Sequence, residues 1–241
     1  VEDLSAAVRA VEMHGESIKS TRIKLLDLMS AYGVAETDAH RLVDEWIIEG
    51  DFLLADLPDT FTHTVGNPPY VRQELIPNAL MAKYRARYHT IYDRADLYIP
   101  FMERCLCSLE PGGALGFICA DRWMKNRYGG PLRAMIAEEY HLAVYVDMVD
   151  TPAFHSEVIS YPAITIIRRE SSGPTRIAYR PQIEWETLRK LARAVCADDV
   201  KEDRRVIEVA NVTMNSEPCL FQAAHQPHAL GRPEPGFPFM E

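Results

Sequence analysis

The residues best suited to chemistry lie in the segment TVGNPPYVRQE, residues 64–74, where two prolines follow an asparagine directly after a predicted strand. A proline fixes its own φ and pushes the preceding residue out of the helical region, so Pro68 and Pro69 form a stiff, extended loop. Such a loop can present the Asn67 side-chain oxygen and the Pro68 carbonyl as two acceptors, with Tyr70 as a stacking face. The pattern suits a planar heterocycle with an exocyclic amino group, although a rigid structural turn also explains a bare N-P-P-Y string.

The elements around this loop are expected to alternate between strands and helices. Helices of ten or more residues between short apolar strands predict βαβ units and a mainly parallel, doubly wound α/β sheet. Ligands bind such sheets at the carboxyl ends of the strands, and the NPPY loop, the GDF triplet and the acid of VEM all fall at or beside predicted strand ends. Strands are expected at 8–13, 51–56, 61–66, 114–120, 142–149 and 158–169, and helices at 17–33, 36–50, 95–113 and 127–140.

The character of the sequence changes after about residue 170. Residues 168–176 read as a linker or turn, residues 183–199 as an isolated helix, and residues 225–241 as an extended, Pro-rich tail. Within the last predicted strand, Pro162 indicates an edge position or a bulge, because proline cannot donate to a strand ladder. The expected domains are therefore 1–170 and a linker with the start of a helical or extended segment over 171–241.

Composition and charge narrow the class of protein. The chain has 241 residues, 47% hydrophobic and 25% charged, which is ordinary for a globular protein, and it has no apolar run of membrane-spanning length. It begins without Met and without the layout of a signal peptide, so we expect a piece of a longer, cytoplasmic protein. The five cysteines form no CxxC pair and no zinc-like spacing with histidine, and are read as reduced structural thiols.

The distribution of charge matters more than the net charge of -9, which argues against a protein that coats nucleic acid nonspecifically. Residues 72–94 hold five basic and two acidic side chains, and residues 121–133 hold four basic side chains and one acid. Residues 36–60 hold eight acids and one base. Two basic stretches thus follow the NPPY loop in an acidic protein, although charge runs are often only solvated surface.

Taken in order, these motifs resemble the N6-adenine DNA methyltransferases of the bifunctional type II restriction–modification and phage-defence branch. The most specific match is GNPPYVRQE at 66–74, and GDFLL at 50–54 is similar to the family's strand-end acid motif. VEMHGES at 11–17 resembles the earlier acidic motif. The block at 96–133, with its D-L-Y, and the segment FHSEVISYPAITII at 154–167 resemble later family segments.

The resemblance implies S-adenosylmethionine as the cofactor and a Rossmann-like methyltransferase fold. In the family, the strand-end Asp binds the cofactor's adenine N6 and the following Phe stacks on that ring, which points to Asp51 and Phe52. The earlier acid holds the ribose hydroxyls, which implies Glu12 with Met13 against the adenine, and Asn67 is also expected to contact the cofactor.

The resemblance also implies how the substrate is held. Asn67, Pro68, Pro69 and Tyr70 would form the catalytic loop around an adenine flipped out of double-stranded DNA, and Phe154 would pack on the same base. No metal is expected. The expected phosphate contacts are Arg72, Lys83, Arg85, Lys125 and Arg127.

The resemblance covers about residues 1–170 and departs from the family at one point. The glycine-rich motif on the family's first strand has no counterpart here, so the catalytic domain is expected to lack that strand. A nuclease or target-recognition domain on the same or another chain is an expected partner, and no membrane is. Two other readings stay open: an amino-group methyltransferase that acts on RNA or on a protein glutamine, and a non-catalytic DNA-binding subunit.

Overall fold

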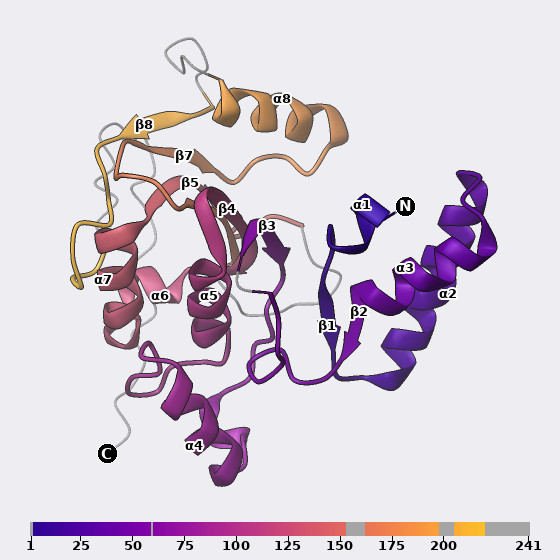
Figure 1. Cartoon of the computed structure of the whole chain (residues 1–241). Helices are drawn as coiled ribbons and strands as arrows, with labels where there is room; N and C mark the ends of the chain where they lie inside the picture. Colours follow the sequence, from indigo (N-terminus) through magenta and orange to yellow (C-terminus); the bar gives the residue numbers. More distant parts are fainter. Residues whose placement is uncertain (1, 59, 153–161, 198–204, 220–241) are drawn as a thin grey trace.

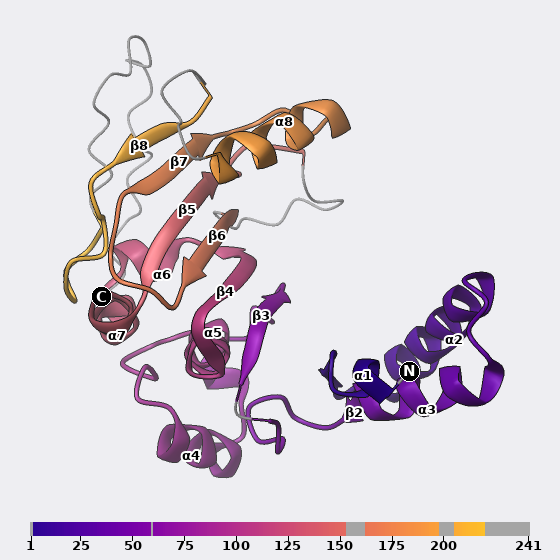
Figure 2. The same cartoon turned by 45° about the horizontal axis from the view of Figure 1, so that its top comes forward.

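The structure, a computed structural model, describes residues 2–58, 60–152, 162–197 and 205–219 of the chain. A small N-terminal α/β unit lies beside a larger part that is built on a six-stranded sheet (Figures 1 and 2). None of the helices within these ranges is both long and apolar enough to cross a membrane.

The N-terminal unit pairs two short strands and packs two helices together. Its strands run parallel, with Val11 opposite Ile48, and its helices enclose a small apolar core. The first long helix ends where expected, because Gly33 takes a φ of 75° that other residues rarely adopt. The elements are α1 (Glu2–Ser5), β1 (Ala10–Glu12), α2 (Gly15–Ala31), α3 (Glu36–Trp46) and β2 (Ile47–Glu49).

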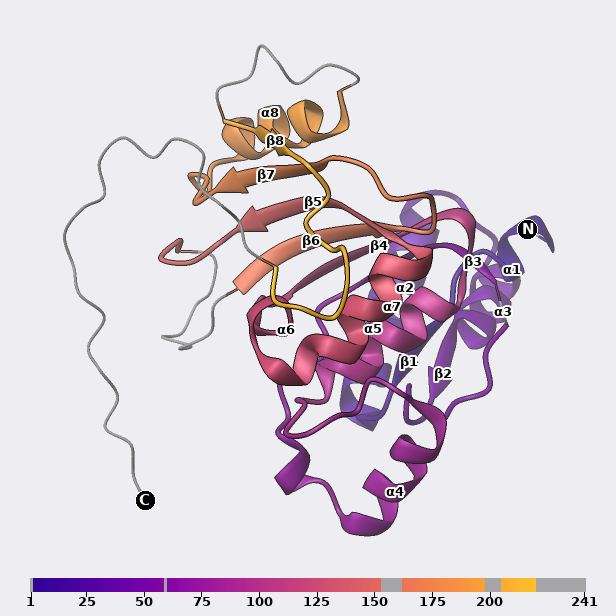
Figure 3. The same cartoon turned by 90° about the vertical axis from the view of Figure 1, so that its left-hand side faces the viewer.

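The larger sheet has the strand order β3-β4-β6-β5-β7-β8. β6 is antiparallel to both of its neighbours and β8 is antiparallel to β7, so β3, β4, β5 and β7 share one direction (Figure 3). The mainly parallel α/β sheet is therefore confirmed. The strands are β3 (Phe61–Gly66), β4 (Leu109–Ala120), β5 (His141–Asp147), β6 (Pro162–Arg168), β7 (Thr175–Tyr179) and β8 (Ile207–Val209).

Helices cover both faces of this sheet. A large apolar cluster joins α5 (Tyr98–Cys107) and α7 (Gly130–Glu139) to one face, with Leu106 and Leu115 fully buried. A second cluster places α8 (Trp185–Cys196) against β5 and β7 on the other face (Figure 2). The other helices of this part are α4 (Asn78–Arg87), α6 (Arg122–Lys125) and the 3₁₀ turns η1 (Gln73–Leu75) and η2 (Arg127–Gly129). This double coverage is the doubly wound arrangement that the alternation predicted.

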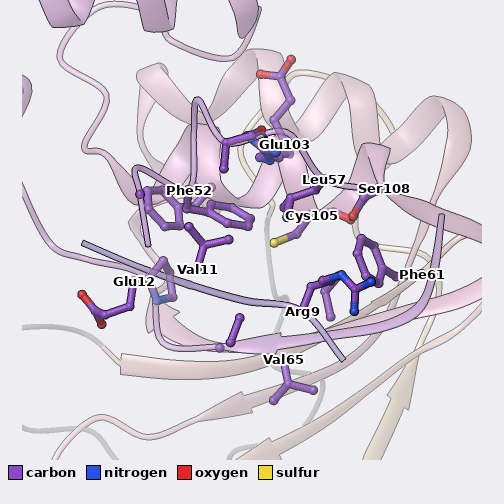
Figure 4. Close-up of a pocket in the computed structure, with 18 of the residues that line it drawn as sticks. Arg9, Val11, Glu12, Phe52, Leu57, Phe61, Val65, Glu103, Cys105 and Ser108 are labelled. Atoms are coloured by element: carbon purple, nitrogen blue, oxygen red, sulfur yellow. Dashed lines mark hydrogen bonds between the residues drawn. The ribbon is translucent and has the colours of Figure 1, made fainter. Parts of the chain in front are cut away.

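A gap separates the two parts of the fold. β1 pairs only with β2, and β3 only with β4, among the strands of the described ranges. β1 and β3 face each other across this gap, and both strands begin at the same end of it. Arg9, which precedes β1, lies near Phe61, the first residue of β3 (Figure 4). The expectation that the sheet lacks one strand stays a prediction.

Two expected elements near this gap are wrong. The helix expected over 36–50 ends at Trp46, and the β-branched pair Ile47 and Ile48 forms β2 instead by pairing with β1. The strand expected over 51–56 is a turn, in which the Asp51 carbonyl accepts hydrogen bonds from the N–H groups of Leu54 and Ala55. Pairing with β1 thus makes residues 47–49 a strand although they continue the helical pattern. The strand of this region therefore lies before residue 50 and not over 51–56 as expected.

Other differences concern the later elements. Pro162 was expected on an edge strand or at a bulge, but it begins β6, which lies in the middle of the sheet. Proline is tolerated there because the first residue of a strand does not need to donate an N–H to the neighbouring strand. The helix of residues 183–199 is not isolated, since Leu191 and Val195 on α8 are buried in the second apolar cluster. The helix expected over 95–113 ends at Cys107, and Pro111 lies inside the long strand β4. The sheet continues past residue 170 through β7 and β8.

Candidate functional site

A cavity of about 900 Å³ runs along β1 and β3, between the two parts of the fold, and reaches the carboxyl ends of both strands. Its walls come from residues 9–14, the turn at 50–58 and the segment 61–69, together with side chains of α5. Glu12 and Phe52 lie toward one end of the cavity, and Arg9 and Phe61 toward the other (Figure 4). Its size is suited to a nucleoside-sized ligand.

The NPPY loop forms one rim of this cavity. β3 ends at Gly66, and Asn67, Pro68 and Pro69 all line the cavity. Pro68 is buried, whereas Asn67 is exposed and its amide makes no hydrogen bond within the described residues. The loop therefore packs against the protein through Pro68, and the Asn67 amide can donate or accept hydrogen bonds with a ligand.

Tyr70 lies on the other side of the loop and does not line the cavity. Its ring is 43% exposed and its centroid is 6.1 Å from that of Tyr98. Partial burial, reinforced by the nearby Cys119, raises the pKa of Tyr70 to about 12, so the phenol is neutral at physiological pH. Part of the ring stays accessible for stacking on a planar group.

Asp51 is more constrained than its expected role requires. One carboxylate oxygen accepts the Leu53 N–H at 2.9 Å, and the other accepts the Tyr84 hydroxyl at 2.5 Å. Asp51 itself is absent from the cavity lining, whereas its neighbours Gly50 and Phe52 are part of it. The carboxylate orders the turn at 51–55, and any ligand amino group would have to share an oxygen with Tyr84.

Phe52 lines the cavity, and its ring is held by Phe101 and Arg104, which the sequence analysis did not identify. Its ring centroid lies 4.9 Å from that of Phe101, and the Arg104 guanidinium lies 4.9 Å from the Phe52 centroid. Arg104 also donates to the Ala55 carbonyl at 2.6 Å and to the Tyr88 hydroxyl at 3.4 Å. The i, i+3 spacing of Phe101 and Arg104 on a predicted helix is the signal that could have found them.

Glu12 and Met13 stand at the end of β1. One Glu12 oxygen accepts the N–H groups of Met13 at 2.8 Å and of His14 at 2.9 Å, just before α2 begins. Both residues line the cavity, and Met13 is 60% exposed. The second Glu12 oxygen has no hydrogen bond among the described residues, so it can accept one from a ligand hydroxyl.

The expected phosphate contacts do not form one group. Arg72 and Arg127 line a second, smaller hollow, and Lys83 and Arg85 lie exposed on α4. Lys125 forms an ion pair of 2.7 Å with the buried Asp121. Phe154 lies outside the described residues.

The thiols and potential metal ligands of the described ranges form no metal site. No group of three His, Cys, Asp or Glu side chains there is arranged to hold a metal ion. All five cysteines are free thiols, and burial raises the pKa of both Cys105 and Cys119 to about 12. These two thiols are therefore protonated at physiological pH, as expected for structural cysteines.

The chain is similar to proteins of restriction–modification systems. The family model of the Eco57I restriction-modification methylase matches residues 15–154. The type II methyltransferase M.PaeR7I of Pseudomonas aeruginosa is 55% identical over all of this chain and 42% of its own length. The type II methyltransferase M.XhoI of Xanthomonas vasicola is 49% identical over 99% of this chain and 44% of its own. This chain thus spans less than half the length of these relatives.

The fold has a counterpart among solved structures. The methyltransferase subunit of a type I restriction-modification system from Streptococcus thermophilus superposes with a TM-score of 0.60. The match covers 84% of this chain and 44% of that one, at 14% sequence identity. At this identity the likeness concerns the fold alone.

Proposed function

Because this chain belongs to the Eco57I restriction-modification methylase family, we propose that it carries the catalytic machinery of a DNA methyltransferase specific for adenine N6. The proposed donor is S-adenosylmethionine and the proposed substrate is an adenine flipped out of double-stranded DNA. The observation that carries this proposal is a single cavity that combines the Asn67-Pro68 rim with Phe52 and Glu12. Such an enzyme would act in the cytoplasm, beside a nuclease or target-recognition domain on the same or another chain.

The cavity residues fit an adenosine-containing cofactor in most respects. Phe52 offers a supported aromatic ring for a purine, and the free oxygen of Glu12 suits a ribose hydroxyl. Asp51 fits less well, because both of its oxygens already have partners. When bound, the cofactor would supply an electrophilic methyl group on its sulfonium.

The residues of the loop would position the acceptor. The Asn67 side-chain oxygen and the Pro68 carbonyl would each accept one hydrogen of the adenine amino group, which localises the nitrogen lone pair for attack on the methyl carbon. With the cofactor bound, the amino nitrogen would gain the methyl group as the sulfonium loses it, and the amino group would release one proton to solvent. Holding the reacting atoms in line supplies much of the rate enhancement in such transfers.

Extrusion of the base would be offset by stacking on Tyr70. Unstacking a base and breaking its pair costs roughly a few kcal/mol. Stacking on an aromatic side chain returns about 1–3 kcal/mol per base, and the exposed part of the Tyr70 ring is the surface available for it.

A second candidate, a non-catalytic DNA-binding subunit, is favoured by two observations. The Asp51 carboxylate is occupied by Tyr84, and the edges of β1 and β3 that border the cavity have no strand partner within the described ranges. Both features would weaken cofactor binding. The same loop also suits the amino group of an RNA base or of a protein glutamine, because either group carries two hydrogens.

The test is transfer of a labelled methyl group from S-adenosylmethionine to duplex DNA, RNA and protein in parallel, with nucleoside analysis of the product. The proposal predicts label in N6-methyladenine of duplex DNA. Label in RNA or protein alone would replace the proposed substrate. DNA binding without transfer, and without cofactor binding by calorimetry, would favour the non-catalytic subunit.

A further inference from the structure

A second hollow, of about 590 Å³, lies beside the NPPY loop and shares no lining residue with the cofactor cavity. Four arginines line it, from segments that are well separated in the sequence: Arg72, Arg94, Arg122 and Arg127. Only two of the four were expected to contact a ligand. The chain as a whole has a net charge of -9, whereas arginines outnumber acids in the lining of this hollow.

The fold brings these segments together at the carboxyl end of β4. Arg72 follows the NPPY loop, and the backbone there is tied to the next segment by a hydrogen bond of 2.9 Å from the Leu97 N–H to the Val71 carbonyl. Arg122 begins α6, directly after β4, and Arg127 follows in η2. All four side chains are exposed, and Arg127 also donates to the Tyr92 hydroxyl at 3.2 Å.

Acidic side chains also line the hollow but do not neutralise it. Glu74, Asp93 and Asp96 are present, one fewer than the arginines. Burial raises the pKa of Asp96, against the opposing effect of Arg122 and Arg72, which favours its neutral form more than in an exposed acid. Neither Arg72 nor Arg94 makes a side-chain hydrogen bond or ion pair within the part of the chain that the structure describes.

Aromatic residues connect this hollow to the proposed site of base stacking. Tyr128 lines the hollow, and its hydroxyl lies 3.0 Å from that of Tyr98. The Tyr98 ring in turn contacts Tyr70, at 6.1 Å between centroids. Tyr128 and Tyr98 therefore link the arginine-lined hollow to Tyr70.

We propose that this hollow binds a backbone phosphate of the DNA strand that carries the target nucleotide, with Arg94 and Arg122 as contacts in addition to Arg72 and Arg127. The inference rests on the proposed function. Arginine suits it, because the planar guanidinium donates two parallel hydrogen bonds to phosphate oxygens and stays charged. Lys125 and Arg85, which were expected contacts, are instead held by Asp121 and Gln73 outside the hollow.

The test is the salt dependence of binding to a fluorescent DNA duplex of about 20 base pairs, read by anisotropy. The variant Arg94→Gln/Arg122→Gln removes two hollow arginines. The control Lys190→Gln/Arg193→Gln removes the same charge from exposed positions on α8, outside the hollow. One neutralised phosphate contributes about 0.9 to the slope of log affinity against log salt, so loss of the proposed phosphate contact should lower the slope of the hollow variant by about 0.9.

The corresponding loss of affinity at 0.05 M salt is about tenfold, and the control should change far less. Equal effects in the two variants would overturn the hollow as a phosphate site and leave the proposed function standing. No duplex binding by the unchanged chain would overturn both, and a loss confined to RNA binding would overturn the assignment to DNA. If Arg122→Gln lowers the thermal stability, Arg72→Gln/Arg94→Gln gives the same test without loss of a described intramolecular bond.

Discussion

Replacing Arg104 with methionine tests whether Phe52 is held in place as a cofactor platform. Methionine keeps much of the length and the apolar packing of the side chain but removes the guanidinium above the Phe52 ring, 4.9 Å from its centroid. It also removes the hydrogen bonds to the Ala55 carbonyl and the Tyr88 hydroxyl. The turn that presents Phe52 to the cavity should then become less ordered.

The magnitude follows from these contacts. A hydrogen bond from a charged donor contributes about 1.5–3 kcal/mol, which applies to the short bond to Ala55. A half-buried cation over an aromatic ring adds about 0.5–2 kcal/mol. We expect the free energy of unfolding of Arg104→Met to fall by roughly 2–4 kcal/mol. Because Phe52 is then held less firmly, we also expect the cofactor affinity to fall by at least about tenfold.

The assays are urea unfolding and titration with S-adenosylmethionine by calorimetry. The matched control is Arg87→Met, because Arg87 also donates to the turn, at 3.2 Å to the Leu53 carbonyl, and lines the cavity, but does not lie over Phe52. Its cofactor affinity should stay within about threefold of the unchanged protein, since one long hydrogen bond contributes little. If Arg104→Met lowers stability and leaves cofactor affinity unchanged, Phe52 is a packing residue and the reasoning fails.

Three other predictions concern single contacts. Tyr70→Ala should weaken binding of DNA with an extruded adenine by roughly 1–3 kcal/mol, whereas Tyr70→Phe should bind normally, as measured by fluorescence of a base analogue at the target position. Tyr84→Phe frees one oxygen of Asp51 and should raise cofactor affinity in calorimetry; a tenfold loss would show that the hydroxyl positions the carboxylate for binding. Because the folded pKa of Cys105 and of Cys119 is raised to about 12, their contribution to stability is complete below the unfolded thiol pKa near 9 and is lost as pH rises toward 12. Circular dichroism should therefore show the unfolding midpoint in urea falling between pH 9 and 12, and a flat profile there would contradict the burial of these thiols.

The sequence was sufficient for features that depend on local pattern. The strand at 61–66 and its end at the NPPY loop follow from apolar residues next to a double proline, and β3 has those bounds. The parallel sheet with helices on both faces follows from the alternation of elements. The end of α2 at Gly33 could likewise be predicted, because the left-handed conformation that often ends a helix favours glycine.

Features that depend on distant partners were not readable. The hydroxyl that occupies Asp51 comes from Tyr84, 33 positions away, and no local pattern indicates that contact. Ile47 and Ile48 continue a helical pattern, yet they pair with β1 because the facing strand stabilises an extended backbone. Arg94 and Arg122 could not be identified as candidate phosphate contacts from the sequence, because only the fold places them in one hollow with Arg72.

The most direct test of the central claim is methyl transfer to duplex DNA by Asn67→Ala. The Asn67 amide is exposed and without a partner in the described residues, so its removal should leave the unfolding midpoint unchanged. Loss of one preorganised hydrogen-bonding group at a reacting centre should lower the transfer rate by about 10²–10³-fold. Asn78→Ala, an exposed asparagine at the start of α4, is the control and should keep the full rate. A rate for Asn67→Ala within threefold of the control would contradict the proposal that this loop holds the acceptor amino group.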